Sequence, residues 1–276
     1  MNEAGEIVFQ GQSGSANLVS TPTFRLKQNL VQALRGAPDV DFISGCFAGL
    51  LTEDDNARAV HLIQDIFPRA RIQAYPDYAA AFWASEPGTD LCVIGGTGSL
   101  VCSWNGSRIV KSGGRGYILG DEGAAFQYGR DALLHYFRDR TSTSPSLAKQ
   151  VRELFQCEDE PSIVSRLYRA PSPQAMIAKL AKGLANDAKT GSPYALESLE
   201  HNSDQLAQVV AAHAEAQVAK EKVKICLAGG LWKQSSIFID ALARRLALHS
   251  GKKFTLDRIK NPPVYGAVRL AKEMAK

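Results

Sequence analysis

The stretch Gly95–Ser99, which reads GGTGS, contains residue types that could hold a phosphate group. The backbone amides of a glycine-rich turn can wrap an anion, and Thr97 and Ser99 add hydroxyl groups. Neither common phosphate motif fits, because the last glycine is not followed by Lys and then Ser or Thr, and Val101 stands where the dinucleotide fingerprint needs Gly or Ala. Taken alone, an ordinary tight turn is the simpler interpretation.

Three acidic residues could act on a substrate hydroxyl group. Asp77 follows a predicted strand that ends in proline, and a carboxylate at a strand end could accept a proton. Asp121 and Glu122, in LGDEG, precede a predicted helix. A structural role also explains each residue, since Asp77 could be the N-cap of a helix and the macrodipole favours acidic residues at a helix start.

The first part of the chain alternates between strand and helix patterns. Strands are predicted at Glu6–Gln10, Asp41–Gly49 and 71–77, and helices at Thr23–Leu34, after the capping residue Thr52, and at 78–85. This alternation predicts an α/β lobe that extends to about Pro87.

The second part begins with hairpins. Strand patterns lie on both sides of the Gly95–Ser99 turn, and Asn105-Gly106 predicts another hairpin, so these glycines close a hairpin and do not open a helix. A long helix is predicted from near Asp121, followed by a helical region at Ser146–Val218. A last group of strands and helices contains Gly229–Gly230, which is either a strand-to-helix turn or a place where a flat ligand lies close to the backbone.

Composition excludes several classes of protein. The 276 residues are 45% apolar, which suffices for one large domain or two lobes. The 32 basic and 28 acidic residues are scattered, with a net charge of +4 and no basic run, so nucleic acid is not an expected partner. Five cysteines without a CxxC pair, no signal-peptide pattern and no long apolar run predict a reduced, cytoplasmic protein without a membrane partner.

Read in order, the motifs resemble one family. An acidic residue at a strand end, the GGTGS hairpin, the cluster GGRGYILGDEG and the late AGG resemble the BadF/BadG/BcrA/BcrD-type ATPases, and most closely the N-acetylglucosamine and glucosamine kinases of the actin-like ATPase superfamily. The resemblance runs from about Gly5 to the C-terminal helix. It implies a two-lobed α/β fold of the ribonuclease-H-like, actin-like type, with nucleotide and sugar in the cleft between the lobes. The lobes would be residues 1–87, completed by 262–276, and residues 88–261.

The resemblance also implies roles for particular residues. It implies phosphorylation of an amino sugar such as N-acetylglucosamine or glucosamine, with ATP and Mg²⁺, and Asp77 as the base that deprotonates the sugar hydroxyl. No residue is assigned as a metal ligand. The residues that match nucleotide contacts are Gly96, Thr97, Gly98, Gly229 and Gly230. The residues that match sugar contacts are Asn17, Asp77, Ser99, Gly114, Arg115 and Asp121.

Two departures from the family pattern affect these expectations. Arg115 replaces the usual tryptophan, and its charge would favour an acidic or phosphorylated sugar. The chain also has no DGGGTK-like motif, the family's first phosphate loop, which predicts weak ATP binding and little kinase activity for the chain as given.

The departures leave two other functions open. One is a non-catalytic sensor of nucleotide or sugar. The other is a dehydratase or reductase activator with an iron–sulfur cluster between subunits, which the positions of the five cysteines do not favour. The sequence leaves open whether the chain forms a homodimer.

Overall fold

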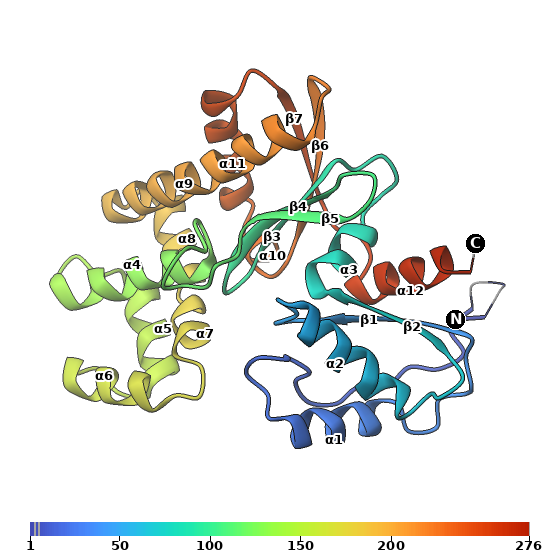
Figure 1. Ribbon diagram of the computed structural model, residues 1–276. Coiled ribbons are helices and arrows are strands. Elements are labelled where there is room, and N and C mark those ends of the chain that lie inside the picture. Colours follow the sequence, from blue (N-terminus) through green and yellow to red (C-terminus); the bar gives the residue numbers. More distant parts are fainter. Residues whose placement is uncertain (3, 5, 276) are drawn as a thin grey trace. The chain divides into compact units, whose positions relative to one another are not determined.

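The computed structural model describes residues 1, 2, 4 and 6–275, and the chain divides into two compact units (Figure 1). Unit 1 comprises Met1–Glu86 with Ile259–Lys276, and unit 2 comprises Pro87–Arg258. The predicted turn at Asn2–Gly5 includes Glu3 and Gly5, which lie outside the described residues.

In unit 1, the described strands are β1 (Phe42–Phe47) and β2 (Arg71–Pro76), which pair in parallel with Phe42 opposite Arg71. A core that includes Leu26, Phe47 and Leu62 packs around them. The helices of this unit are α1 (Thr23–Ala33), α2 (Glu53–Gln64), α3 (Asp77–Trp83) and α12 (Pro263–Glu273).

The predicted start of α2 is confirmed in atomic detail. The Thr52 hydroxyl accepts a hydrogen bond from the Asp55 amide, and the Asp55 carboxylate accepts one from the Thr52 amide. This reciprocal capping box satisfies two amides that have no partner within the helix.

The predicted strand at Glu6–Gln10 is wrong. The segment forms no strand, and the side chains of Ile7 and Val8 are 54% and 53% exposed. Apolar alternation favours an extended chain, but a strand also needs a hydrogen-bonded neighbour, and in the described sheet β1 pairs only with β2.

The C-terminal helix α12 packs tightly on α3. A Cβ atom at Gly266 would overlap the carbonyl oxygen of Ala80, so glycine is needed for this approach. The Arg269 guanidinium donates hydrogen bonds to the carbonyls of Trp83, at 2.9 Å, and Ser85, at 2.7 Å. These bonds satisfy carbonyls at the C-terminal end of α3, which have no partner within the helix.

In the described part of unit 2, five strands form one mixed sheet in the order β5-β4-β3-β6-β7. β3 pairs antiparallel with β4 and parallel with β6, and the β4–β5 pair is antiparallel, so both predicted hairpins are confirmed. The strands are β3 (Leu91–Gly95), β4 (Ser99–Trp104), β5 (Ile109–Gly113), β6 (Lys222–Ala228) and β7 (Lys253–Arg258).

Helices pack on this sheet around a core that includes Val93, Val101, Ile225 and Val210. The predicted helical region is confirmed, with breaks at its two proline-containing segments. A further break, at 156–159, was not predicted, and Gln156 there has a φ of 54° in the left-handed region. The helices are α4 (Ala125–Arg138), α5 (Pro145–Phe155), α6 (Glu160–Arg169), α7 (Pro173–Ala178), α8 (Ala181–Lys189), α9 (Pro193–Gln217), α10 (Leu231–Gln234) and α11 (Ile237–His249). None of the helices in the described residues is both long enough and apolar enough to cross a bilayer.

The helix predicted from Asp121 begins at Ala125, four residues later than expected. Asp121 and Gly123 have φ angles of 59° and 65°, in the left-handed region. Residues in that region cannot continue a right-handed helix, so the residues before α4 form a turn instead.

Candidate functional site

The glycine turn between β3 and β4 is held by the start of α4. The amides of Ala125 and Phe126 donate hydrogen bonds to the carbonyls of Gly96, at 2.9 Å, and Thr97, at 3.3 Å. In many phosphate sites such helix amides hold the anion. Here these two amides bind the turn itself, so a phosphate would have to be held by amides and hydroxyls of the turn.

The second glycine pair lies against this turn. Gly229, at the end of β6, has a φ of 108°, and a Cβ atom there would overlap the carbonyl oxygen of Gly95. Gly230 has open space where its side chain would be. The structure therefore brings together the two stretches predicted to bind nucleotide, and Gly229 has a structural reason to be glycine.

Trp232 supports the same turn, a role that the sequence analysis missed. Its buried indole N–H donates to the carbonyl of Val93 at 3.2 Å, and its ring occupies the space where Gly95 would carry a Cβ atom. Its position two residues after the Gly229–Gly230 pair is the sequence feature that could have indicated this supporting role.

Asp121 joins the glycine turn to the following loop. Its carboxylate accepts backbone hydrogen bonds from Ser99 and Gly116 and lies 2.5 Å from where a Cβ atom of Gly98 would be. Only 8% of the residue is exposed, and this burial raises the pKa of Asp121 above its usual range, although both hydrogen bonds act in the opposite direction. The Ser99 hydroxyl donates to the Glu122 carbonyl at 2.7 Å. The two predicted sugar contacts Ser99 and Asp121 are therefore adjacent.

The loop that contains Arg115 is bounded by glycines in the left-handed region. Gly114 and Gly116 have φ angles of 66° and 82°, and the Lys111 ammonium donates to the Gly114 carbonyl at 3.3 Å. Arg115 itself is exposed, and no ion pair or hydrogen bond of its side chain is recorded within the described residues. Ile118 and Leu119 are 78% and 73% exposed. The loop thus presents one cation and two apolar side chains to its surroundings.

Asp77, in unit 1, is the first residue of α3. The N-cap position of this helix belongs to Pro76, one residue before the position that the capping interpretation expected. Burial raises the pKa of the neighbouring Cys46 thiol to about 11, and the charge of Asp77 contributes in the same direction. The carboxylate is therefore close to a thiol that stays neutral at physiological pH.

Asn17, also in unit 1, makes local hydrogen bonds. Its side-chain oxygen accepts from the amides of Val19 and Ser20, both at 2.9 Å. The same oxygen lies 2.8 Å from where a Cβ atom of Gly49 would be. A turn-forming role therefore accounts for this asparagine, and its role in sugar binding stays a prediction.

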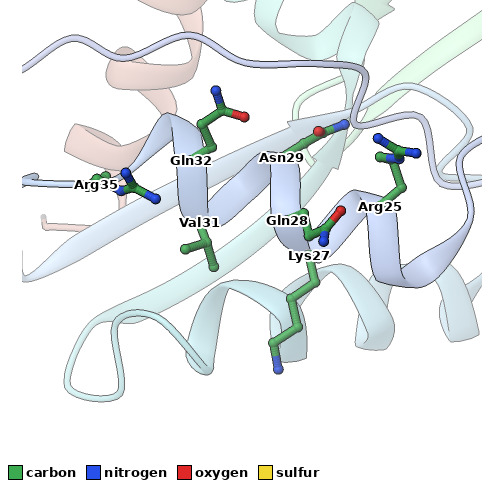
Figure 2. Close-up of a pocket in the computed structure, with 7 residues that line it drawn as sticks. All are labelled: Arg25, Lys27, Gln28, Asn29, Val31, Gln32 and Arg35. Atoms are coloured by element: carbon green, nitrogen blue, oxygen red, sulfur yellow. The ribbon is translucent and has the colours of Figure 1, made fainter.

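Two hollows in the structure lie away from these residues. One, of about 440 Å³, follows α1, and Figure 2 shows Val31 and Lys27 pointing to the opposite side of the helix from Gln32. Lys27 is paired with Asp65 at 2.7 Å. The other, of about 460 Å³, lies between α4 and α9, where the rings of His135 and Tyr194 stack at 3.6 Å. None of the residues predicted for the site lines either hollow.

Comparison with known families settles the relationship of the chain. Residues 1–268 match the sequence profile described as the BadF/BadG/BcrA/BcrD ATPase family. The chain belongs to this family. The resemblance found in the sequence is therefore confirmed over nearly the whole chain.

Three proteins that this member of the BadF/BadG/BcrA/BcrD family is similar to are named as sugar kinases. An N-acetylmuramic acid/N-acetylglucosamine kinase of Clostridium acetobutylicum is 25% identical over 186 residues, which cover 66% of this chain and 60% of that relative. A solved structure of a candidate N-acetylglucosamine kinase from Porphyromonas gingivalis has a TM-score of 0.76 at 17% identity and covers 100% of this chain and 95% of its own. Another, from Chromobacterium violaceum, has a TM-score of 0.72 at 22% identity, with coverages of 98% and 92%. The fold is therefore the actin-like ATPase fold of sugar kinases.

Within the described residues, no group of three or more His, Cys, Asp and Glu side chains is arranged to hold a metal ion. Cys92, Cys102 and Cys226 are buried at paired positions of three adjacent strands. These three cysteines are buried cross-strand neighbours, and this burial does not favour a role as ligands of a cluster shared between subunits.

Proposed function

We propose that this chain is an ATP-dependent kinase of an amino sugar such as N-acetylglucosamine or glucosamine. The observation that carries the proposal is the convergence of three stretches on one turn of unit 2: Gly229 packs against Gly95, and Asp121 packs against Gly98. Membership of an ATPase family and the kinases named among the relatives support the same conclusion.

In this proposal, the glycine turn holds the phosphates of ATP. The Gly96 amide already donates to the Gly98 carbonyl, so it is not a proposed phosphate donor. The proposed donors are the amide and hydroxyl of Thr97, which is exposed, and the Gly98 amide. The open space at Gly230 suits a flat adenine ring. ATP supplies the phosphoryl group, and Mg²⁺ would bind mainly through the phosphates and water, a common arrangement for this ion.

Asp77 is the proposed general base. The sugar hydroxyl oxygen attacks the γ-phosphorus, the bond between that phosphorus and the ADP oxygen breaks, and the hydroxyl proton passes to the Asp77 carboxylate. The position of Asp77 directly after β2 supports this role, because a carboxylate at the end of a strand can accept a proton from a bound hydroxyl group.

Among amino sugars, this proposal favours acceptors that carry a negative charge. Arg115 presents a guanidinium without a recorded partner in the described part of the chain, and guanidinium groups bind carboxylate and phosphate in a two-pronged geometry. The name of the Clostridium acetobutylicum relative includes an acidic amino sugar. We therefore expect acidic amino sugars to be better acceptors than neutral ones.

A coupled assay of ADP release tests the proposal. It would compare N-acetylglucosamine, glucosamine, N-acetylmuramic acid and sugar phosphates, with Asp77→Asn as the inactive control and calorimetry for ATP binding. Because the chain has no DGGGTK-like loop, we expect weak ATP binding and slow sugar-dependent ADP release, which the Asn variant loses. ATP binding without release for any sugar would contradict the kinase and support a nucleotide sensor instead.

A further inference from the structure

A buried histidine connects the long helix α9 to the two strands that lead to the candidate site. His213 is 4% exposed, and its ring nitrogens lie 2.9 Å from the Ser103 hydroxyl and 2.8 Å from the Ser112 hydroxyl. Ser103 belongs to β4 and Ser112 belongs to β5. One imidazole ring thus bonds both strands of a hairpin.

The chemistry of this cluster suits a fixed position. Burial lowers the pKa of His213 below its usual range, so the ring is neutral, with one nitrogen that donates and one that accepts. A serine hydroxyl can play either part, so each tautomer is satisfied at both nitrogens. No charge is buried in this cluster, and both ring nitrogens have a partner.

The two serines differ in their distance from the candidate site. Ser112 lies opposite Val101 in the β4–β5 pair and directly precedes Gly113 and Gly114, whose φ angles are 75° and 66°. Ser103 lies opposite Val110, toward the other end of the hairpin. The bond to Ser112 therefore acts where regular pairing ends and the Arg115 loop begins.

The start of this loop needs an anchor because its backbone is unusually free. Gly113, Gly114 and Gly116 are all in the left-handed region, and glycine has the widest choice of backbone conformations. The C-terminal part of the loop is already held by hydrogen bonds. The Gly116 amide donates to the Asp121 carboxylate, and the Gly120 carbonyl accepts from the Gln127 side chain at 3.3 Å. At the near side, the His213–Ser112 bond and the contact of Lys111 with Gly114 hold the strand end.

We infer that His213 is a positioning residue, which holds Ser112 and thereby fixes the Gly114–Arg115 segment where the sugar binds. This inference rests on the proposed function, because the sugar contacts of that segment are part of it. A histidine that only satisfies hydrogen bonds in the core would support both strands equally. A positioning residue acts more strongly through Ser112 than through Ser103.

The matched pair Ser112→Ala and Ser103→Ala tests the inference. Each variant removes one serine hydroxyl that bonds to the His213 ring, so the melting temperatures should fall by similar amounts. We expect Ser112→Ala to raise the KM for the sugar about fivefold, on the scale of one lost hydrogen bond, with the KM for ATP unchanged. Ser103→Ala should leave both KM values unchanged. Equal effects of the two variants on the sugar KM would overturn the inference.

Amide hydrogen exchange provides a readout that needs no activity. In the unliganded protein, exchange of residues 113–120 should be faster in Ser112→Ala than in Ser103→Ala, because only the first variant releases the near end of the loop. Equal exchange in the two variants would count against His213 as a positioning residue even if no sugar were turned over. If the wild-type chain turns over no sugar but the exchange rates differ as expected, the kinase proposal fails and the anchoring role stands.

The double variant His213→Phe/Ser112→Ala completes the test. If His213 acts on the loop through Ser112, then loop exchange in the double variant should match that in His213→Phe alone. Additive increases would show that the two residues act on the loop independently, and the inference would be wrong.

Discussion

Unit 1 and unit 2 hold their candidate residues in different ways. In unit 2, Gly98, Ser99, Asp121 and Gly229 are linked through one turn, and moving any of them disturbs its neighbours. In unit 1, Asp77 stands directly after β2, at the first residue of α3, and close to the Cys46 thiol. The first arrangement suits groups that bind and orient a ligand, and the second suits a group that changes its protonation state.

This difference predicts different consequences of substitution. Changes in unit 2 should alter binding and stability together, because the same contacts serve both. A change at Asp77 should alter the chemical step and leave the fold intact.

Asp77→Asn should have the largest effect on the reaction. We expect turnover to fall at least about a hundredfold, the scale of a positioned general base, while ATP affinity and melting temperature stay near those of the wild type. Steady-state kinetics, calorimetry and thermal unfolding would measure the three quantities.

Asp54→Asn is a matched control, since Asp54 is an exposed acid in the first turn of α2 in the same unit. Its turnover should equal that of the wild type. Normal turnover in Asp77→Asn would remove Asp77 from the mechanism.

Gly229→Ala should disturb unit 2 next most strongly. A Cβ atom there would overlap the Gly95 carbonyl, and the φ of 108° is unfavourable for alanine. We expect a loss of about 1–3 kcal/mol in the free energy of unfolding, typical of backbone strain. ATP affinity should fall about tenfold, because the overlap with the Gly95 carbonyl would displace the glycine turn that is proposed to hold the phosphates.

Gly230→Ala is the control for the stability change, because Gly230 has open space for a Cβ atom and a φ of −72°. Urea unfolding should give a nearly wild-type free energy of unfolding for it, whereas its ATP affinity should fall, because the added methyl group would enter the space proposed for the adenine ring. Similar losses of stability in both variants would mean that the contact between Gly229 and Gly95 does not hold the turn.

Asp121 should link sugar binding to pH. Because burial raises its folded-state pKa, the folded protein binds this proton more tightly than the unfolded chain does. The free energy of unfolding of the wild type, relative to Asp121→Asn, should therefore be greatest below the unfolded-state pKa. It should fall as the pH rises through the raised folded-state value.

Urea unfolding of both proteins over a series of pH values would measure this difference. Asp121→Asn should also raise the KM for the sugar about tenfold at neutral pH, the scale of a lost bond to a charged acceptor. A difference that does not change with pH would contradict a raised pKa for Asp121.

The elements were predictable from local signals, and the links between them were not. Asn105-Gly106 predicted a hairpin, and Thr52 with Asp55 satisfied a local capping pattern, because each signal acts within a few residues. Glu6–Gln10 had the pattern of a strand, but strand formation depends on a neighbour that the pattern does not specify. The start of α4 was predicted near Asp121, because an acidic residue is common at a helix start and its residue type does not reveal the left-handed backbone found there.

The candidate site shows the same limit. The glycines at 95–98 and 229–230 were found from their types, since glycine marks places where backbones approach closely. The supporting residues were missed because their partners are distant in sequence. Trp232 bonds Val93, and His213 bonds Ser103 and Ser112.

Arg115→Trp should have the smallest effect and would sharpen the difference between binding and chemistry. Arg115 is exposed, so its interaction with a sugar is partly screened by water, and we expect its loss to change the preference for acidic over neutral amino sugars about threefold to tenfold. The ratio of kcat/KM for N-acetylmuramic acid to that for N-acetylglucosamine should fall, while kcat stays constant. Raising the salt concentration should reduce the wild-type ratio toward that of the variant, because salt screens exposed charges. Arg108→Trp, which changes an exposed arginine in the Asn105–Arg108 turn of the same unit, should leave the ratio unchanged. An unchanged ratio in Arg115→Trp would show that this side chain does not face the sugar. The charge of Arg115 would then have no part in the choice between acidic and neutral sugars.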